Sequence, residues 1–563
     1  MICAGDSLPD GGETGVDVAI VRAGPVGIAL AVRLAGRVGR IALIEAGGPR
    51  YKPAESSEFF RAAEVTDPRH MPTDLYRRRM LGGTTSIWGG RCTPFDPEDF
   101  ASGPGRPGWP IAFVEVDTHI PDALEFFDAG VPEYSSASTL PKYPISLDPS
   151  ATDLIVDRIE RWSKPTNVWE KYGSMLSRSR HVTVIHGATC TNVVTNADGT
   201  CVTALELRTP SNRSHKVVTS TVVLACAGLE TPRLLLASRG SRSCGLGNEH
   251  DLVGRFYMAH LASDAQNVGA LRFTKPEAAR AFDFIKMETG IYARRMILLS
   301  PDARQREGIG NIIFRPSRRP IDDAAHRDSV LSAMFLARNL LIPAEYMRSL
   351  AVGTRFASIL RQRDHMVNVA ADLPKLFGFG IQWMKKRVFA TRKLPAVFLY
   401  RKDGTYPLEF NAEQLPNPES RVSLGHGVDP FGMPRLLVRW QVRDTELDGI
   451  CRAYRLLAAA VAKSGLGSVL LDPNLPGSVA RSLCPQGGVH IGTVRMGSNP
   501  QTGVVNPNGE VWNIRGLFVA GTATFPTSGC ASPTLTAVAL AFRMAEYLVG
   551  RRTRGLSSTA RNG

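Results

Sequence analysis

Apolar and polar residues are ordered along the chain as repeated units of strand, glycine turn and helix. The first unit is an apolar run over residues 16–21, a turn that holds Gly24 and Gly27, and a helix that opens directly behind them. The next apolar run, RIALIEAGG, carries Glu45 near its end. This order predicts a β-α-β unit that places a pyrophosphate at a helix N-terminus and a carboxylate at a ribose hydroxyl. Arg22 stands where such a turn normally has its first glycine.

The same pattern recurs twice further along the chain. Residues 221–226 form an apolar strand that leads into a glycine turn and a helix, and residues 517–520 form a short apolar strand before Gly521 and Thr522. An Ala- and Leu-rich helix is expected over 533–548. The first and last units share this pattern although they lie at opposite ends of the chain. We therefore expect both ends to fold into one discontinuous domain.

The middle of the chain has a different character. From 272 to 410 it mixes basic, apolar and aromatic residues, and helical spacing fits most of this segment better than strand alternation. We interpret it as a helical cap packed on a core. A basic amphipathic surface for a membrane or an electron-transfer partner is the alternative. Strands are expected again from Asn417, and a helix from Asp444 to Ser464.

Composition restricts the class of protein. A chain of 563 residues with 43% apolar residues is too long for one compact core, which favours a globular protein of two or more domains. Its nine scattered cysteines support neither a zinc site nor a disulfide framework. The net charge of +15 comes without an aromatic-basic recognition motif, so we expect no nucleic-acid partner.

The expected location follows from the lack of export and membrane signals. The N-terminus has no basic region followed by an apolar run, and no segment reaches the roughly 18 apolar residues that a membrane span needs. We expect a cytoplasmic protein. The basic stretch 355–393 leaves peripheral docking on a membrane or on a protein partner open.

An ordered set of motifs resembles the glucose-methanol-choline (GMC) oxidoreductases, in particular their sugar and polyol branch. The motifs are the dinucleotide turn with Glu45, LGGTTSIWGGR at Leu81, CAGLETPRLLL at Cys226, NPESRVSL at Asn417, HIGTVRMG at His490 and VAGTATFPTSGCASPTLTAVALA at Val519. The resemblance spans nearly the whole chain. It implies an α/β flavoprotein fold, with a Rossmann-like FAD-binding domain and a discontinuous substrate-binding domain built on an antiparallel sheet plus a helical cap.

The resemblance also suggests domain limits. The FAD-binding domain is expected over 14–110, 180–270 and 485–552, and the substrate-binding and cap domain over 111–179 and 271–484. Residues 1–13 and 553–563 are expected to be flexible tails.

The resemblance implies that FAD is bound in an extended pose along these motifs. The implied contacts are Gly24 and Gly27 with the pyrophosphate, Glu45 with the adenosine ribose, the backbone near Cys190 with the adenine, Gly83, Thr84 and Trp88 with the flavin side, and Gly521 and Thr522 over the pyrophosphate and ribityl chain. The helix N-terminus at Pro533 and Thr534 would point its amides at the electron-rich edge of the isoalloxazine. There the positive end of the helix favours an anionic reduced flavin.

The implied reaction oxidises a CH-OH group of a sugar, polyol or glycosylated small molecule by hydride transfer to flavin N5, while a base removes the hydroxyl proton. A histidine suits this base because its pKa lies near neutrality. The family's histidine slots read Val489, His490 and Val494 here, so His490 is the expected proton acceptor. Ser532 replaces the family's Asn or His and is expected to hydrogen-bond the substrate hydroxyl.

Three departures from the family pattern, at Arg22, Val489 and Ser532, leave other interpretations open. One is a flavin-fold partner or binding subunit with altered or lost redox chemistry, and another is a non-oxidative, lyase-like use of the scaffold. A side chain at positive φ costs on the order of 1 kcal/mol at position 22, although arginine also binds phosphate well. The electron acceptor is left open among oxygen, a quinone and another protein.

Overall fold

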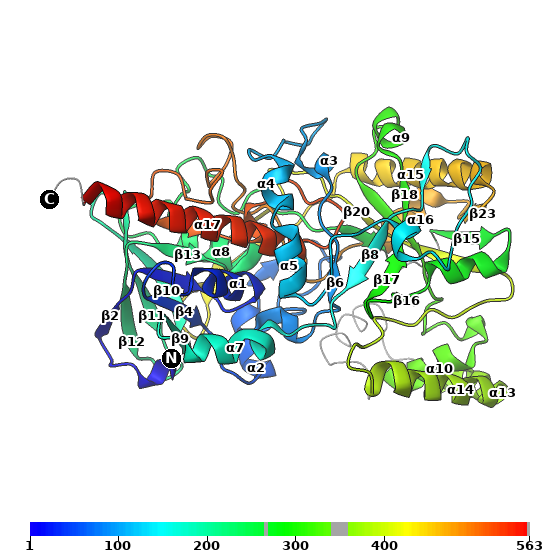
Figure 1. Ribbon diagram of the computed structural model, residues 1–563, viewed down its shortest axis with the longest axis horizontal. Helices are drawn as coiled ribbons and strands as arrows, with labels where there is room; N and C mark the ends of the chain where they lie inside the picture. The colour runs from blue at the N-terminus through cyan, green and yellow to red at the C-terminus, as the bar shows by residue number, and fades with distance from the viewer. Residues whose placement is uncertain (264–267, 339–358, 560–563) are drawn as a thin grey trace.

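The computed structural model describes residues 1–263, 268–338 and 359–559 (Figure 1). The N- and C-terminal segments lie together at one end of the molecule, around a parallel sheet. The sheets built from the middle of the chain lie at the other end. Among the described residues, no helix has the length and apolar character needed to cross a bilayer.

The nucleotide-type end is built on a six-stranded parallel sheet. Its order is β1 (Ile2–Ala4), β9 (Val182–His186), β4 (Ile41–Glu45), β3 (Val18–Val21), β13 (Val222–Leu224) and β25 (Leu517–Val519). Strands from both ends of the chain therefore share one sheet. Helices α1 (Pro25–Leu34) and α17 (Thr534–Thr559) pack on it and on each other. The predicted Rossmann-like α/β class is confirmed by this architecture.

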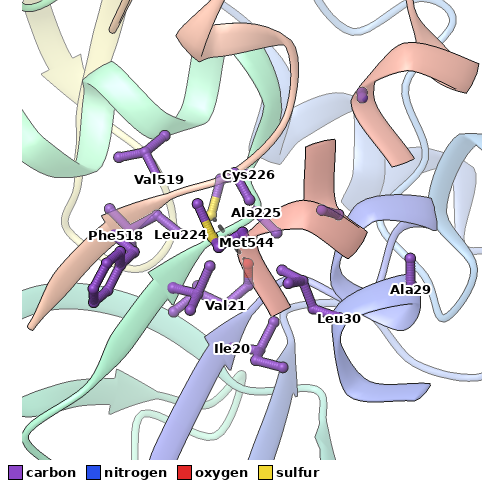
Figure 2. Packing of buried hydrophobic residues seen from close by; sticks show 14 of the residues in the cluster. Ile20, Val21, Ala29, Leu30, Leu224, Ala225, Cys226, Phe518, Val519 and Met544 are labelled. Atoms are coloured by element: carbon purple, nitrogen blue, oxygen red, sulfur yellow. Dashed lines mark hydrogen bonds between the residues drawn. The ribbon is translucent and has the colours of Figure 1, made fainter. Parts of the chain in front are cut away.

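The core of this end explains why its strands read as continuous apolar runs. Every residue of β3, β4, β13 and β25 is buried, as expected for parallel strands that are covered on both faces. Figure 2 shows side chains of β3, β13 and β25 meeting those of the helices, with Leu30 of α1 and Met544 of α17 among them.

The other end of the molecule carries a large, mostly antiparallel sheet. Its order is β23 (Gly467–Leu471), β15 (Gly269–Phe273), β20 (Thr405–Ala412), β19 (Ile312–Pro316), β18 (Ile297–Leu299) and β7 (Leu154–Ile155), with β14 (Leu261–Ser263) and β24 (Leu483–Pro485) attached. Helix α15 spans Asp444–Ser464, the limits that the sequence predicts. It packs against β23 and β7, so this sheet has a core of its own.

Smaller sheets complete the fold. They are β10 (Thr189–Thr195), β11 (Val202–Arg208), β12 (Ser214–Val218) and β2 (Gly12–Gly15); β16 (Ile285–Lys286), β17 (Tyr292–Arg295), β8 (Ile159–Trp162) and β6 (Arg91–Cys92); and β21 (Arg421–Val428), β22 (Pro434–Arg439) and β5 (Glu64–Val65). The remaining α-helices are α2 (Pro53–Phe60), α3 (Pro97–Phe100), α4 (Phe113–Asp117), α5 (Ile120–Phe126), α6 (Ser136–Thr139), α7 (Val168–Arg178), α8 (Ala227–Ala237), α9 (Pro301–Arg306), α10 (Ser329–Leu336), α13 (Ile359–Ala371), α14 (Leu373–Trp383) and α16 (Leu475–Ser482).

Two expectations from the sequence need correction. Residues 1–13 are not a flexible tail, because they contain β1 and enter β2, whose backbones pair with β9 and β12. The expected C-terminal tail is helical as far as Thr559, and 560–563 lie outside the described residues. Helices α10, α13 and α14 confirm that the described part of 329–388 is helical, but short strands lie between 285 and 316 where the sequence indicated helical spacing. Strands such as β17 and β19 are buried at every position, so they lack the alternation that marks a half-exposed strand.

The turn between β3 and α1 is exceptionally close. A Cβ atom on Gly27 would lie 1.9 Å from the carbonyl oxygen of Arg22, whereas a Cβ on Gly24 would meet no described atom within 4 Å. Gly24 has φ −81°, a value open to any residue, but Arg22 has φ 91°. The backbone contact therefore requires glycine at position 27, and the strained residue is Arg22.

We expect Gly27→Ala to lower the free energy of unfolding by about 3 kcal/mol or more, because neither backbone segment can move without displacing α1 from the sheet. Gly24→Ala is the matched control and should cost less than about 1 kcal/mol. Chemical denaturation of the two variants measures both values. Equal losses in the two variants would contradict this account of the turn.

Candidate functional site

A cavity of about 600 Å³ runs from the β3–α1 turn to the start of α17. It is lined by segments far apart in the sequence, which the two ends of the fold bring together. Most of the residues singled out in the sequence line it: Gly24, Glu45, Gly83, Thr84, Trp88, His490, Gly521, Thr522, Ser532, Pro533 and Thr534. Gly27 lies beneath the turn, and Cys190 lines a separate cavity of about 30 Å³.

Glycines form one wall of the long cavity. Gly83 has φ 54°, and a Cβ atom there would lie 3.2 Å from Cα of Gly24. Gly521 has φ 101°, a conformation that few L-residues adopt. Gly24 begins α1, and among the described residues no side chain caps that helix N-terminus. Bare backbone and a helix N-terminus therefore face the same space, which suits an anionic group.

Glu45 lies at the end of β4 and is already engaged by its neighbours. Its Oε2 accepts a hydrogen bond from the Ala23 amide at 3.0 Å, and its Oε1 accepts one from the Gly47 amide at 2.8 Å. The Arg22 guanidinium donates to Oε1 at 3.2 Å. The same guanidinium lies 5.2 Å from the ring centroids of Phe59 and of Phe60, at the end of α2. Arg22 thus folds over the carboxylate instead of away from the site.

Arg22 also separates two cavities. Together with Cys226 it lines both the long cavity and the small cavity at Cys190. The predicted adenine contact near Cys190 and the predicted ribose contact at Glu45 therefore lie on different sides of the Arg22 side chain.

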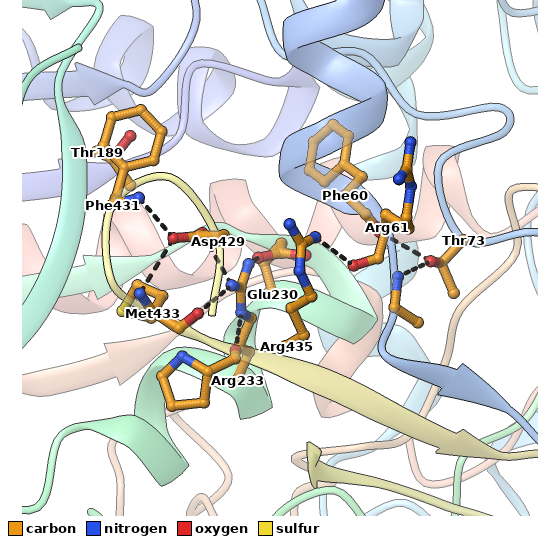
Figure 3. A network of polar contacts seen from close by, with 12 residues as sticks. Phe60, Arg61, Thr73, Thr189, Glu230, Arg233, Asp429, Phe431, Met433 and Arg435 are labelled. Atoms are coloured by element: carbon orange, nitrogen blue, oxygen red, sulfur yellow. Dashed lines mark hydrogen bonds and ion pairs between the residues drawn. The ribbon is translucent and has the colours of Figure 1, made fainter. Parts of the chain in front are cut away.

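Buried charged side chains lie near Arg22, which borders both the long cavity and the small cavity. Arg233 donates to Glu230 at 3.1 Å and to Asp429 at 2.8 Å, as Figure 3 shows. Burial alone would raise the pKa of Glu230, but Arg233 and then Arg77, whose guanidinium lies 2.7 Å away, lower it to about 2. Burial and then the charge of Arg22 lower the pKa of Arg79 to about 10. The positive charge of Arg79 is thus destabilised, whereas at Arg22 the effect of burial is outweighed by Glu45 and other neighbouring groups, which raise the pKa.

At His490, three side chains form a continuous hydrogen-bonded relay. Nδ1 of His490 lies 2.7 Å from the hydroxyl oxygen of Tyr257, and this oxygen lies 2.8 Å from Nε2 of His70. Nδ1 of His70 lies 2.6 Å from the carbonyl oxygen of Met71. Nε2 of His490 is buried and has no hydrogen-bond partner among the described residues.

The relay assigns every proton along it. The Met71 carbonyl only accepts, so Nδ1 of His70 carries a proton and its Nε2 accepts from the Tyr257 hydroxyl. The Tyr257 oxygen then accepts from Nδ1–H of His490. Burial lowers the pKa of His70, and burial followed by the charges of Arg77 and His70 lowers the pKa of His490 well below its ordinary value. Both rings are neutral near pH 7, and His490 presents a bare Nε2 lone pair.

The remaining predicted residues have clear positions. Ser532 is half-buried in the cavity wall directly before α17, and Val489 lines the cavity beside His490. Val494 is fully buried in the core. Trp88 is fixed by the hydrogen bond from its Nε1 to the Thr166 carbonyl at 3.0 Å.

His70 and Tyr257 were missed by sequence reasoning. His70 stands in a segment with no recognisable motif. Tyr257 lies in GNEHDLVGRFYMAH at Gly247, which resembles the GMC family, but 187 residues separate the two side chains and only the fold brings them together.

We expect Tyr257→Phe to let His490 populate both of its neutral tautomers, because the Nδ1–H group loses the hydroxyl oxygen that accepts its hydrogen bond. In ¹⁵N-histidine NMR spectra, the form protonated only at Nδ1 should give way to a mixture with the Nε2–H form, and stability should fall by about 1–3 kcal/mol. His490→Gln identifies the signal. Tyr172→Phe, which removes a hydroxyl bonded to the Phe126 carbonyl, is the control. An unchanged His490 signal in Tyr257→Phe would refute the relay.

Known proteins match this chain in sequence and in fold. Residues 416–541 match the sequence model of the GMC oxidoreductase family. The chain is 22% identical over 606 aligned positions to the 2-methyl-1,2-propanediol dehydrogenase of Mycolicibacterium austroafricanum, which covers 95% of each chain. It is 35% identical over 133 residues to the C-glycoside 3-oxidase of Microbacterium trichothecenolyticum, 23% of this chain and 24% of that one.

Among solved structures, pyridoxine 4-oxidase from Mesorbium loti has a similar fold. The TM-score is 0.53 at 18% identity, over 94% of this chain and 98% of that chain. The GMC oxidoreductases bind FAD. Residues 416–541 thus carry the sequence pattern of the GMC oxidoreductases, a relative aligns along nearly the whole chain, and a solved oxidase shares the fold.

Proposed function

We propose that the chain is an FAD-dependent oxidoreductase that oxidises a CH-OH group of a sugar, polyol or glycosylated small molecule. The observation that carries the proposal is that His490 lines the long cavity and that its buried Nε2 has no hydrogen-bond partner among the described residues. Relatives whose names include a diol dehydrogenase and a C-glycoside 3-oxidase support a hydroxyl compound as substrate.

The residues of the long cavity fit FAD. Gly24, Gly83 and Gly521 leave backbone free to approach a phosphate-bearing chain, and the N-terminus of α1 favours a pyrophosphate. Thr84, Trp88 and Thr522 line the same space, as do Pro533 and Thr534 at the N-terminus of α17. Bound FAD would supply the acceptor for the hydride that leaves the alcohol carbon.

His490 would take the hydroxyl proton at Nε2 while its Nδ1–H stays with Tyr257. A neutral imidazole accepts this proton without first losing one. Its low pKa means that the proton moves only as the alcohol carbon loses hydride, since that loss makes the hydroxyl much more acidic. Ser532, in the same cavity wall, would hydrogen-bond the substrate oxygen and help to orient it.

One observation favours the alternative of a flavin-fold binding or partner subunit that has lost redox chemistry. The Arg22 guanidinium is hydrogen-bonded to Glu45, the residue expected to contact a ribose. The Arg22 side chain also lies between the two cavities. A protein of that class would bind no FAD, or would bind it without reduction by an alcohol. A lyase-like use would convert substrate while the flavin spectrum stays oxidised.

We expect His490→Ala to slow flavin reduction about 10²- to 10⁴-fold without loss of bound FAD, because it removes the proton acceptor. The measurement is anaerobic bleaching of the FAD-loaded protein by glucose, glycerol and 1,2-propanediol. Ser532→Ala should lower the rate less, since it removes one hydrogen bond. An unchanged rate in His490→Ala would refute the assigned base.

The pH dependence should follow the depressed pKa of His490. The base is unprotonated above its own pKa, so the bleaching rate should be flat between about pH 6 and 8 and fall only at lower pH. A rate that follows a group titrating near 6.5 would contradict a buried, neutral His490.

A further inference from the structure

Helices α10, α13 and α14 form a projecting group at the end of the molecule away from the six-stranded parallel sheet (Figure 1). Polar contacts hold this group together. Ser332 of α10 lies 3.0 Å from Nδ1 of His365 and accepts from the Asn368 amide at 3.1 Å. At the start of α14, Lys375 pairs with Asp328 at 2.5 Å. The polar groups His365 and Asn368 of α13 thus face α10.

The outward side of α14 is apolar, which inverts the usual pattern of a surface helix. Large exposed side chains recur three or four residues apart along α14 and the helical turn 384–388 that continues it, so they share one face: Leu373, Phe377, Ile381, Met384 and Val388. Phe377 is 73% exposed, and Phe389 just beyond it is 75% exposed. We call these six residues the α14 face. Contiguous exposed apolar surface of this kind marks an interaction site.

The charges around the α14 face identify its partner. Residues 373–393 contain six basic side chains and no acidic one. Lys375 pairs with Asp328, and Arg387 and Arg392 donate to backbone carbonyls, which leaves Lys385, Lys386 and Lys393 as the charges exposed to solvent. Lys385 and Lys386 are exposed directly beside the apolar residues. An apolar stripe bordered by lysines is the pattern of a helix that lies in the plane of an anionic membrane surface.

We propose that the α14 face docks this protein on an anionic membrane, with the apolar side chains between the headgroups and the lysines on lipid phosphates. The helix is too short to cross the bilayer, so binding is peripheral and reversible. Charge complementarity favours a lipid surface as the partner over a second copy of this chain. Two identical faces would bring the lysines of both copies together, and these like charges would repel. The proposal stands without the redox chemistry proposed above.

The test is flotation of the full-length protein with vesicles of phosphatidylcholine, with or without phosphatidylglycerol. We expect binding to the anionic vesicles only, and its loss at high salt. Phe377→Ser with Ile381→Ser should weaken binding by about tenfold or more. Lys385→Gln with Lys386→Gln should weaken it by about fivefold for each charge removed.

Controls separate this proposal from other outcomes. Val114→Ser with Val131→Ser removes two exposed apolar side chains outside the α14 face and should leave binding unchanged. Thermal unfolding confirms that all variants fold. Equal binding to neutral vesicles, no binding to anionic vesicles at low salt, or a loss of self-association in Phe377→Ser with unchanged flotation would each overturn the proposal.

Discussion

The close backbone contact between Gly27 and the carbonyl of Arg22 determines where the rest of the site can lie. It holds the first turn of α1 against the end of β3, so Gly24 faces the cavity and α1 starts at the edge of the parallel sheet. Gly83 and Gly521 approach the same point from two other segments of the chain. A nucleotide-type cavity therefore depends on one glycine that lines none of it.

The same turn explains how an arginine is tolerated at position 22. A non-glycine residue in a strained backbone region costs about 1–3 kcal/mol. A hydrogen bond between charged groups contributes about 1.5–3 kcal/mol, so the contact from Arg22 to Glu45 is large enough to offset the strain. The consequence is functional, because the carboxylate expected to contact a ribose is held by the protein's own side chain.

Much of the fold could be predicted because it rests on local patterns. The strand, glycine and helix units around Gly24 and Gly521 and the helix Asp444–Ser464 all have signals within a few dozen residues. The short strands between 272 and 410 could not be recognised, since burial on both faces removes the alternation. His70 and Tyr257 reach His490 only through the tertiary fold, so a motif identified the proposed base but not the side chains that orient it.

The central claim is that this cavity binds FAD and that Arg22 obstructs its adenosine end. The direct measurement is a titration of the purified apoprotein and of its Arg22→Gly variant with FAD, followed by flavin fluorescence. We predict that both bind, and that Arg22→Gly binds about tenfold more tightly, equivalent to about 1.4 kcal/mol, because Glu45 is freed and the two cavities join. No binding by either protein, or weaker binding by the variant, would contradict the account.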